Sequence, residues 1–151
     1  MINKLAATAA TGAVMAASLT ITSPATAAQV HRHDRACSVA TLRGAYSGNI
    51  RGISNTGPFN LQSTTVFHGD GTATGTKVTL ADESGVSTFT ADDTYTLNDD
   101  CTGTLTAVRS TGVTVNYVIV LVDGGAKVAL LQTDPGYVAS GAFDRVAGMR
   151  P

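Results

Sequence analysis

The feature that most constrains the fold is a run of short β-type segments separated by turns, from residue 45 to residue 146. Thr, Val, Gly and Ala dominate this region, and β-branched residues recur at short intervals, which is typical of strands. No window in it shows apolar residues at the i, i+3, i+4 and i+7 spacing of an amphipathic helix. The pattern therefore predicts an all-β fold.

Turn residues divide the region into eight expected strands. Glycines in His68–Gly71 and Asp123–Gly125 supply the positive φ angles that tight hairpins need, and Asp134–Gly136 sets a Pro-led turn. A longer loop is expected from Gly52 to Pro58. The expected strands are 45–53, 61–68, 71–80, 85–97, 102–109, 113–123, 126–133 and 136–146.

Connections this short make consecutive strands antiparallel neighbours. A row of eight such strands has two unpaired edges, which invite aggregation, unless the sheet closes on itself. We therefore predict a single antiparallel up-and-down β-barrel of about eight strands. A two-sheet β-sandwich is the alternative.

The N-terminus has the pattern of an export signal. Met1–Lys4 is a short basic start, Leu5–Ile21 is uncharged and Ala/Thr-rich, and Ser23–Ala27 offers a small-x-small cleavage site. The apolar run is too short and too weakly hydrophobic for a membrane span, so no membrane anchor is expected. The predicted division is a signal peptide at 1–27, a flexible leader at 28–36 and a barrel domain at 37–151, in a secreted protein. Cleavage after Ala28 is the alternative.

The chain has only two cysteines, Cys37 and Cys101. Two cysteines in an exported chain usually pair, which predicts one disulfide across a loop of about 64 residues. Two free thiols are the alternative.

Charge and motif content exclude several function classes. Without Lys4, nine basic and eleven acidic side chains remain, and the basic ones are scattered singly. A nucleic-acid-binding protein needs a basic stripe, so no nucleic acid is expected as a partner. The chain also lacks the HExxH, Walker and GxSxG motifs, and we predict neither a catalytic residue nor a cofactor.

Metal-ligating residues give no convincing site. His31, His33 and Asp34 stand close together, but they lie in a polar leader, and we interpret them as solvated. His68 is expected to be an exposed residue at a hairpin tip. The acidic pairs lack the spacing of a calcium loop, and we interpret all of them as solvated turn or edge charges. These pairs are Asp82-Glu83, Asp92-Asp93 and Asp99-Asp100.

The alternation of side chains along each strand predicts which of them face the barrel interior. Phe89, Ala91, Tyr95 and Leu97 share one parity, and a second inward series runs in steps of two from Val113 to Leu121. Asn116 is predicted to face outward. Arg51 and Arg109 interrupt strand segments and would need a partner if they faced inward. The predicted ligand-contacting residues of the lumen are Tyr46, Phe67, Tyr95, Tyr117 and Gln132.

The segment 113–123 is apolar on its other face too, through Val118, Val120 and Val122. A strand with two apolar faces is expected to contact something outside the barrel wall. The N-terminal segment and a second copy in a homo-oligomer are the two alternatives.

Several motifs occur in an order that resembles a family of small exported bacterial proteins without an established activity. These motifs are Cys37–Tyr46, Phe67–Gly71, Thr94–Thr106, Val122–Gly125 and Gln132–Gly136, and the resemblance extends from Cys37 to about Arg145. It implies a compact barrel of the lipocalin-like or allene-oxide-cyclase-like kind and provides no catalytic residues. The chain departs from the family pattern at Ala91–Thr94, where a bulge or an altered bend is expected.

The first functional hypothesis is a binding module that holds a small, mostly apolar molecule in the lumen. A structural or surface-interaction protein acting through the outer face of 113–123 is one alternative. An isomerase or cyclase that uses the lumen is the other.

Overall fold

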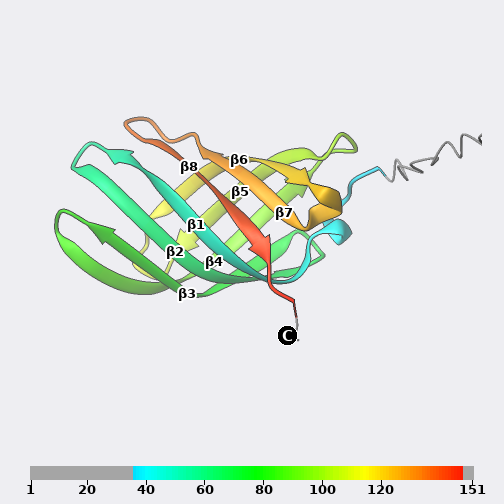
Figure 1. Ribbon diagram of the computed structural model, residues 1–151, viewed down its shortest axis with the longest axis horizontal. Coiled ribbons are helices and arrows are strands. Elements are labelled where there is room, and N and C mark those ends of the chain that lie inside the picture. Colours follow the sequence, from blue (N-terminus) through cyan, green and yellow to red (C-terminus); the bar gives the residue numbers. More distant parts are fainter. Residues whose placement is uncertain (1–35, 148–151) are drawn as a thin grey trace, which may run out of the picture. The chain divides into compact units, whose positions relative to one another are not determined.

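Eight antiparallel strands follow one another in chain order around a closed barrel in the computed structural model, which describes residues 36–147 (Figure 1). Each strand pairs with the next, and β8 pairs with β1. The strands are β1 (Arg43–Ser54), β2 (Gly57–His68), β3 (Thr72–Asp82), β4 (Gly85–Leu97), β5 (Thr102–Arg109), β6 (Thr114–Val122), β7 (Lys127–Gln132) and β8 (Val138–Arg145). The predicted barrel is confirmed, and the sandwich alternative is wrong.

The prediction of a long loop from Gly52 to Pro58 is wrong. β1 and β2 stay paired to Ser54 and Gly57, so that only two residues form the turn. Gly57 has a φ of 120°, which a residue without a side chain adopts at low cost. Pro58 is tolerated because β2 pairs with β3 only from Asn60 onward.

The irregularity expected at Ala91–Thr94 lies on the neighbouring strand instead. β4 keeps an unbroken register with β5 through this stretch. The register between β3 and β4 shifts between Gly75 and Val78. A bulge of this kind bends the strand that carries the extra residue, which here is β3.

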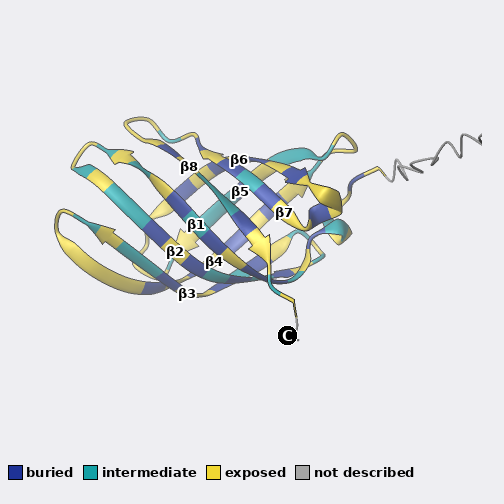
Figure 2. Cartoon of the chain, in the orientation of Figure 1, coloured by how far each residue is buried: buried dark blue, intermediate teal, exposed yellow. Residues whose placement is uncertain are grey.

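Burial alternates along the strands and leaves an apolar core inside the barrel (Figure 2). β6 shows the alternation most clearly, because Val115, Tyr117, Ile119 and Leu121 are all buried and the residues between them are exposed. The assignment of Val113 to this inward series is wrong. Val113 is 46% exposed, since it lies in the turn before β6 begins.

Two short 3-10 helices lie at one end of the barrel, and we call this end the closed end. They are η1 (Val39–Thr41) and η2 (Asp123–Gly125). The predicted disulfide between Cys37 and Cys101 is present and attaches the segment before η1 to the β4–β5 turn. Leu42, which directly follows η1 in the chain, is fully buried. None of the helices among residues 36–147 is long and apolar enough to cross a membrane.

Two buried tyrosines hold the closed end together. The Tyr95 hydroxyl is within hydrogen-bond distance of the carbonyl oxygens of Val39 (2.9 Å), the first residue of η1, and Leu42 (3.1 Å), which directly follows η1. The Tyr46 hydroxyl donates to the carbonyl oxygen of Gly125 in η2 at 2.6 Å and accepts from the Arg145 guanidinium at 2.7 Å. Both hydroxyls therefore fasten the helical segments to the barrel wall.

Replacing Tyr46 with Phe is expected to lower the free energy of unfolding by about 1–3 kcal/mol, because Gly125 and Arg145 each lose a partner at a largely buried position. The control is Tyr137→Phe, since the Tyr137 hydroxyl makes no hydrogen bond to any residue of the described barrel. Urea denaturation measures both. Equal stability of the two variants would contradict the fastening role of Tyr46.

Candidate ligand site in the barrel lumen

The end of the barrel opposite η1 and η2 is open, and no helix among residues 36–147 covers it (Figure 1). The β1–β2, β3–β4, β5–β6 and β7–β8 turns surround this open end. A vestibule of about 110 Å³ lies there. Its wall combines polar and aromatic side chains, namely Ser54, Thr56, Phe59, Leu80, Asp82, Arg109 and Tyr137.

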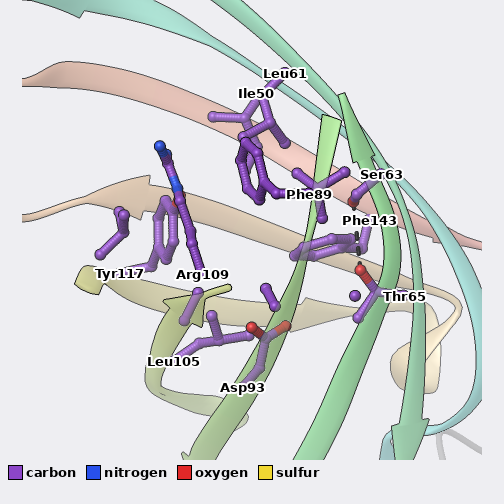
Figure 3. A pocket seen from close by; sticks show the side chains of 15 residues that line it. Ile50, Leu61, Ser63, Thr65, Phe89, Asp93, Leu105, Arg109, Tyr117 and Phe143 are labelled. Carbon is purple, nitrogen blue, oxygen red and sulfur yellow. Dashed lines mark hydrogen bonds between the residues drawn. The ribbon is translucent and has the colours of Figure 1, made fainter. Parts of the chain in front are cut away.

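A second, smaller cavity of about 30 Å³ lies deeper in the lumen (Figure 3). Its wall is mostly apolar and includes Ile50, Leu61, Phe89, Leu105 and Phe143. A space of this size holds about one water molecule, whereas drug-sized ligands occupy pockets of roughly 300–1,000 Å³. The lumen is therefore nearly filled by its own side chains.

Arg109 lines both the deep cavity and the vestibule. Its guanidinium carbon lies 4.9 Å from the centre of the Phe89 ring, in a cation–π contact. Figure 3 shows its side chain beside Tyr117, with the guanidinium directed away from Asp93. The only ion pair within residues 36–147 joins two other residues, so Arg109 has no carboxylate partner in this region. Arg109 and Phe89 thus separate the two spaces.

Asp93 is the one carboxyl group that lines the deep cavity. It is only 6% exposed, and its Oδ1 atom is buried without a hydrogen-bond partner in the described structure. Figure 3 shows the carboxyl directed into the cavity. Burial, and to a smaller degree the charge of Asp92, raises the pKa of Asp93 to about 7.

The interpretation of Asp92-Asp93 as a solvated pair is wrong for Asp93 and right for Asp92, which is exposed. The signal was available in the sequence, because Asp93 has the parity of Ala91 and Tyr95 on the same strand. Period-two alternation places all three on the inner face of β4 whatever their polarity.

Three hydroxyl groups also line the deep cavity. The Thr65 hydroxyl donates to that of Ser63 over 3.3 Å, both from β2. Tyr117 enters from β6, and burial raises the pKa of its phenol to about 12, while the Arg109 charge acts in the opposite direction. Tyr117 therefore stays protonated at neutral pH and can donate or accept a hydrogen bond.

The five predicted lumen residues all point inward but separate into three locations. Tyr117 lines the deep cavity. Tyr46, Phe67 and Tyr95 pack edge-to-face at the closed end, with ring centres 5.0 Å and 5.4 Å apart along the series. Gln132, the last residue of β7, is buried, as its parity predicts. Its side-chain amide donates to an Asp134 carboxylate oxygen at 3.1 Å.

The other polar residues singled out in the sequence lie outside the lumen. Arg51 is exposed, and Asn116 is exposed as predicted. His68 is exposed at a strand end, where its ring nitrogen lies 3.2 Å from the Thr74 hydroxyl. Across residues 36–147 no cluster of three His, Cys, Asp or Glu side chains is placed to hold a metal ion. His31, His33 and Asp34 lie outside the described residues.

A broad groove of about 510 Å³ crosses the outer surface at β2 and β3. Polar side chains line much of it, among them Gln62, Thr64, Lys77 and Thr79. Asn60 also contributes a buried amide oxygen without a partner, but the residue itself is only half-buried. The deep cavity is the better candidate site because its carboxyl group is both buried and directed into the cavity.

Comparison with known proteins supports the fold. No protein-family model matches the chain, and no curated protein matches it. Among solved structures, a de novo designed fluorescence-activating β-barrel is similar to this chain, with a TM-score of 0.53 and 13% sequence identity. The match covers 72% of this chain and 96% of the designed one. A redesigned β-barrel is also similar, with a TM-score of 0.54 and 15% sequence identity, and the match covers 74% of this chain and 96% of the redesigned one. At these identities the likeness concerns the barrel alone, and the resemblance to exported bacterial proteins stays a prediction.

Proposed function

We propose that this protein is a secreted binding module that holds a small, mostly apolar molecule in the barrel lumen. The observation that carries the proposal is the asymmetry of the barrel. One end is closed by η1, η2 and the disulfide, and the other opens through a vestibule toward a deep apolar cavity. One of the two similar designed barrels is fluorescence-activating, so a barrel of this fold can carry a function of its own.

Ligand entry requires Arg109 and Phe89 to move, because their side chains lie between the deep cavity of about 30 Å³ and the vestibule of about 110 Å³. Arg109 is only half-buried and lacks an ion-pair partner within the described barrel, so its rotation breaks one cation–π contact. An apolar cavity of about 150 Å³ is large enough for benzene. The joined spaces therefore suit a ligand of about that bulk.

Secretion is part of the proposal. A disulfide persists in oxidising compartments and is rare in the cytosol, and the Cys37–Cys101 bond fits an extracellular protein. The signal pattern at 1–27 supports the same location.

Replacing Ala107 with Phe is expected to fill the deep cavity, which Ala107 lines, and to weaken binding of a small apolar probe such as phenol at least tenfold. The matched control is Ala129→Phe, because Ala129 lies between the buried Val128 and Leu130 and so faces outward. Amide chemical shifts measured during a phenol titration report both affinities. Equal affinities in the two variants, or no binding to the unmodified protein, would contradict the proposal.

An isomerase or cyclase would use the same lumen, and Asp93 and Tyr117 are acid–base groups within it. This remains the secondary proposal, because the chain carries none of the HExxH, Walker and GxSxG catalytic motifs in its sequence.

Association of two copies is supported by a separate feature, the β6–β7 outer face. This face consists of Val118, Val120 and Val122 on β6 and Leu131 on β7, which are 38–50% exposed. Val118 and Leu131 are direct cross-strand neighbours, so that the face is continuous. The alternative cover for this face is the N-terminal segment before Ala36, which lies outside the described residues.

Replacing Val120 with Lys, at the centre of the β6–β7 outer face, is expected to convert a self-associating protein into a monomer. Val138→Lys is the control, since Val138 is 77% exposed but belongs to a different part of the barrel. Sedimentation equilibrium over a range of protein concentrations measures the difference. A monomeric unmodified protein at the highest concentration would eliminate this candidate.

A further inference from the structure

We propose that Asp93 is the recognition group of the lumen and that it selects a slender alkylamine, whose nitrogen pairs with the Asp93 carboxyl. The inference rests on the proposed function, because the ligand must first enter through the open end.

Asp93 lacks a hydrogen-bond partner among residues 36–147 at a position where burial makes one necessary. Its carboxyl is buried, and Oδ1 makes no hydrogen bond within the described barrel. A buried polar atom without a partner is costly, and native proteins pair nearly all such atoms. A cavity large enough for one polar heavy atom adjoins the carboxyl in the lumen. A ligand that brings a hydrogen-bond donor to this point would remove the deficit.

No side chain among residues 36–147 neutralises Asp93. On its own strand Asp92 is exposed and adds a like charge. On β5, Arg109 is the diagonal neighbour, because Ala91 pairs with Arg109 and Asp93 pairs with Ala107. The Arg109 guanidinium nevertheless lies over Phe89 and is directed away from the carboxyl.

The strands that do not adjoin β4 supply only uncharged groups to the cavity. β2 contributes the Ser63 and Thr65 hydroxyls, which bond to each other, and β6 contributes the protonated Tyr117 phenol. Arg109 is thus the only cation among residues 36–147 that lines the cavity, and its guanidinium lies over Phe89 and not against Asp93.

An amine is the ligand group that fits a buried carboxyl without a partner. A protonated amine with a carboxylate and a neutral amine with a carboxylic acid are two proton positions of the same pair, so an amine matches Asp93 in either protonation state. The amine also brings the cation that the surrounding side chains do not provide. An alcohol supplies one neutral hydrogen bond, and a second carboxylic acid would place two acids together.

The shape of the site restricts the amine to a slender one. The deep cavity of about 30 Å³ accepts a single terminal nitrogen, and the tail must pass Phe89 toward the vestibule. Leu105 and Ala107 are among the side chains that would contact such a tail. An unbranched alkyl chain fits these constraints, whereas a bulky headgroup does not.

The test compares hexylamine with 1-hexanol, which differ only in the terminal group, by amide-shift titration at pH 7. We expect the amine to bind the unmodified protein at least tenfold more tightly, because hydrogen bonds to charged groups are the stronger ones. Asp93→Asn should remove this advantage and leave hexanol affinity within about threefold. Asp92→Asn, at the exposed neighbour, should preserve the advantage.

A second readout does not depend on a variant. The ¹³C resonance of the Asp93 carboxyl should shift to its ionised value on saturation with hexylamine, because an alkylamine, like the Lys side chain, is a much stronger base than a carboxylate and holds the proton of the pair. Equal affinity for hexanol and hexylamine, with an unmoved carboxyl resonance, would overturn the amine assignment and leave lumen binding intact. Failure of both compounds to bind would overturn lumen binding as well.

Discussion

Replacing Asp93 with Asn is expected to stabilise the barrel progressively, relative to the unmodified protein, as the pH rises from about 4 to about 8. The pKa of Asp93 is about 7 in the folded state, against 3.8 for an aspartate that is not buried, so the folded protein binds the extra proton between these values. The unmodified protein keeps its full stability below the unfolded-state pKa of the Asp93 carboxyl. It loses stability as the pH rises through the folded-state pKa. The difference corresponds to about 4 kcal/mol of free energy of unfolding at pH 8.

Urea denaturation of both proteins at several pH values measures this effect, and the quantity compared is the difference between the two stability curves. The asparagine that replaces Asp93 occupies the same buried position, so a constant offset is expected in addition to the pH-dependent part. Asp92→Asn is the control, because Asp92 is exposed and its removal only weakens a like-charge contribution. Parallel curves for the unmodified protein and the Asp93 variant would contradict the burial of this carboxyl.

Removing the disulfide by Cys37→Ser together with Cys101→Ser is expected to lower the free energy of unfolding by about 4 kcal/mol, the value that chain entropy gives for a loop of this length. The bond joins residues 64 apart in the sequence. It also anchors the start of η1, since the Cys37 amide donates to the Asp99 carbonyl oxygen in the β4–β5 turn. The closed end should therefore loosen first.

Thermal unfolding with and without a reductant checks this prediction. Reduction should lower the melting temperature of the unmodified protein to that of the double variant and should leave the variant unchanged. Amide hydrogen exchange should become faster at η1 before it changes in the middle of β1. A melting temperature that does not respond to reduction would contradict a structural role for the bond.

The sequence was most informative where a single physical rule decides the outcome. Glycines at tight turns and period-two alternation predicted the strand order and the inner face, including the inward placement of Tyr117 and Gln132. Neither rule predicts the residue at which a strand begins or ends. The β1–β2 hairpin continued through Pro58 because the pairing partner of each backbone group depends on the register of both neighbouring strands.

The candidate site was less predictable, since its properties depend on contacts between distant parts of the chain. Tyr95 points inward as predicted, but its hydroxyl lies against the carbonyl oxygens around η1, more than fifty residues away in the sequence. Arg51 and Arg109 look alike in the sequence, and only Arg109 reaches the lumen. Acidic residues in pairs usually face solvent, which is the basis of the wrong prediction for Asp93, whereas strand parity places this residue inside.

The most direct test of the lumen as a binding site is an intermolecular NOE measurement between hexylamine and the methyl groups of the protein. We expect cross-peaks to the inward-facing methyls of Ala91, Leu105 and Ala107, which line the deep cavity. Cross-peaks confined to the outward-facing Val120 and Ala129, or their complete absence at saturating amine, would show that the lumen holds no ligand.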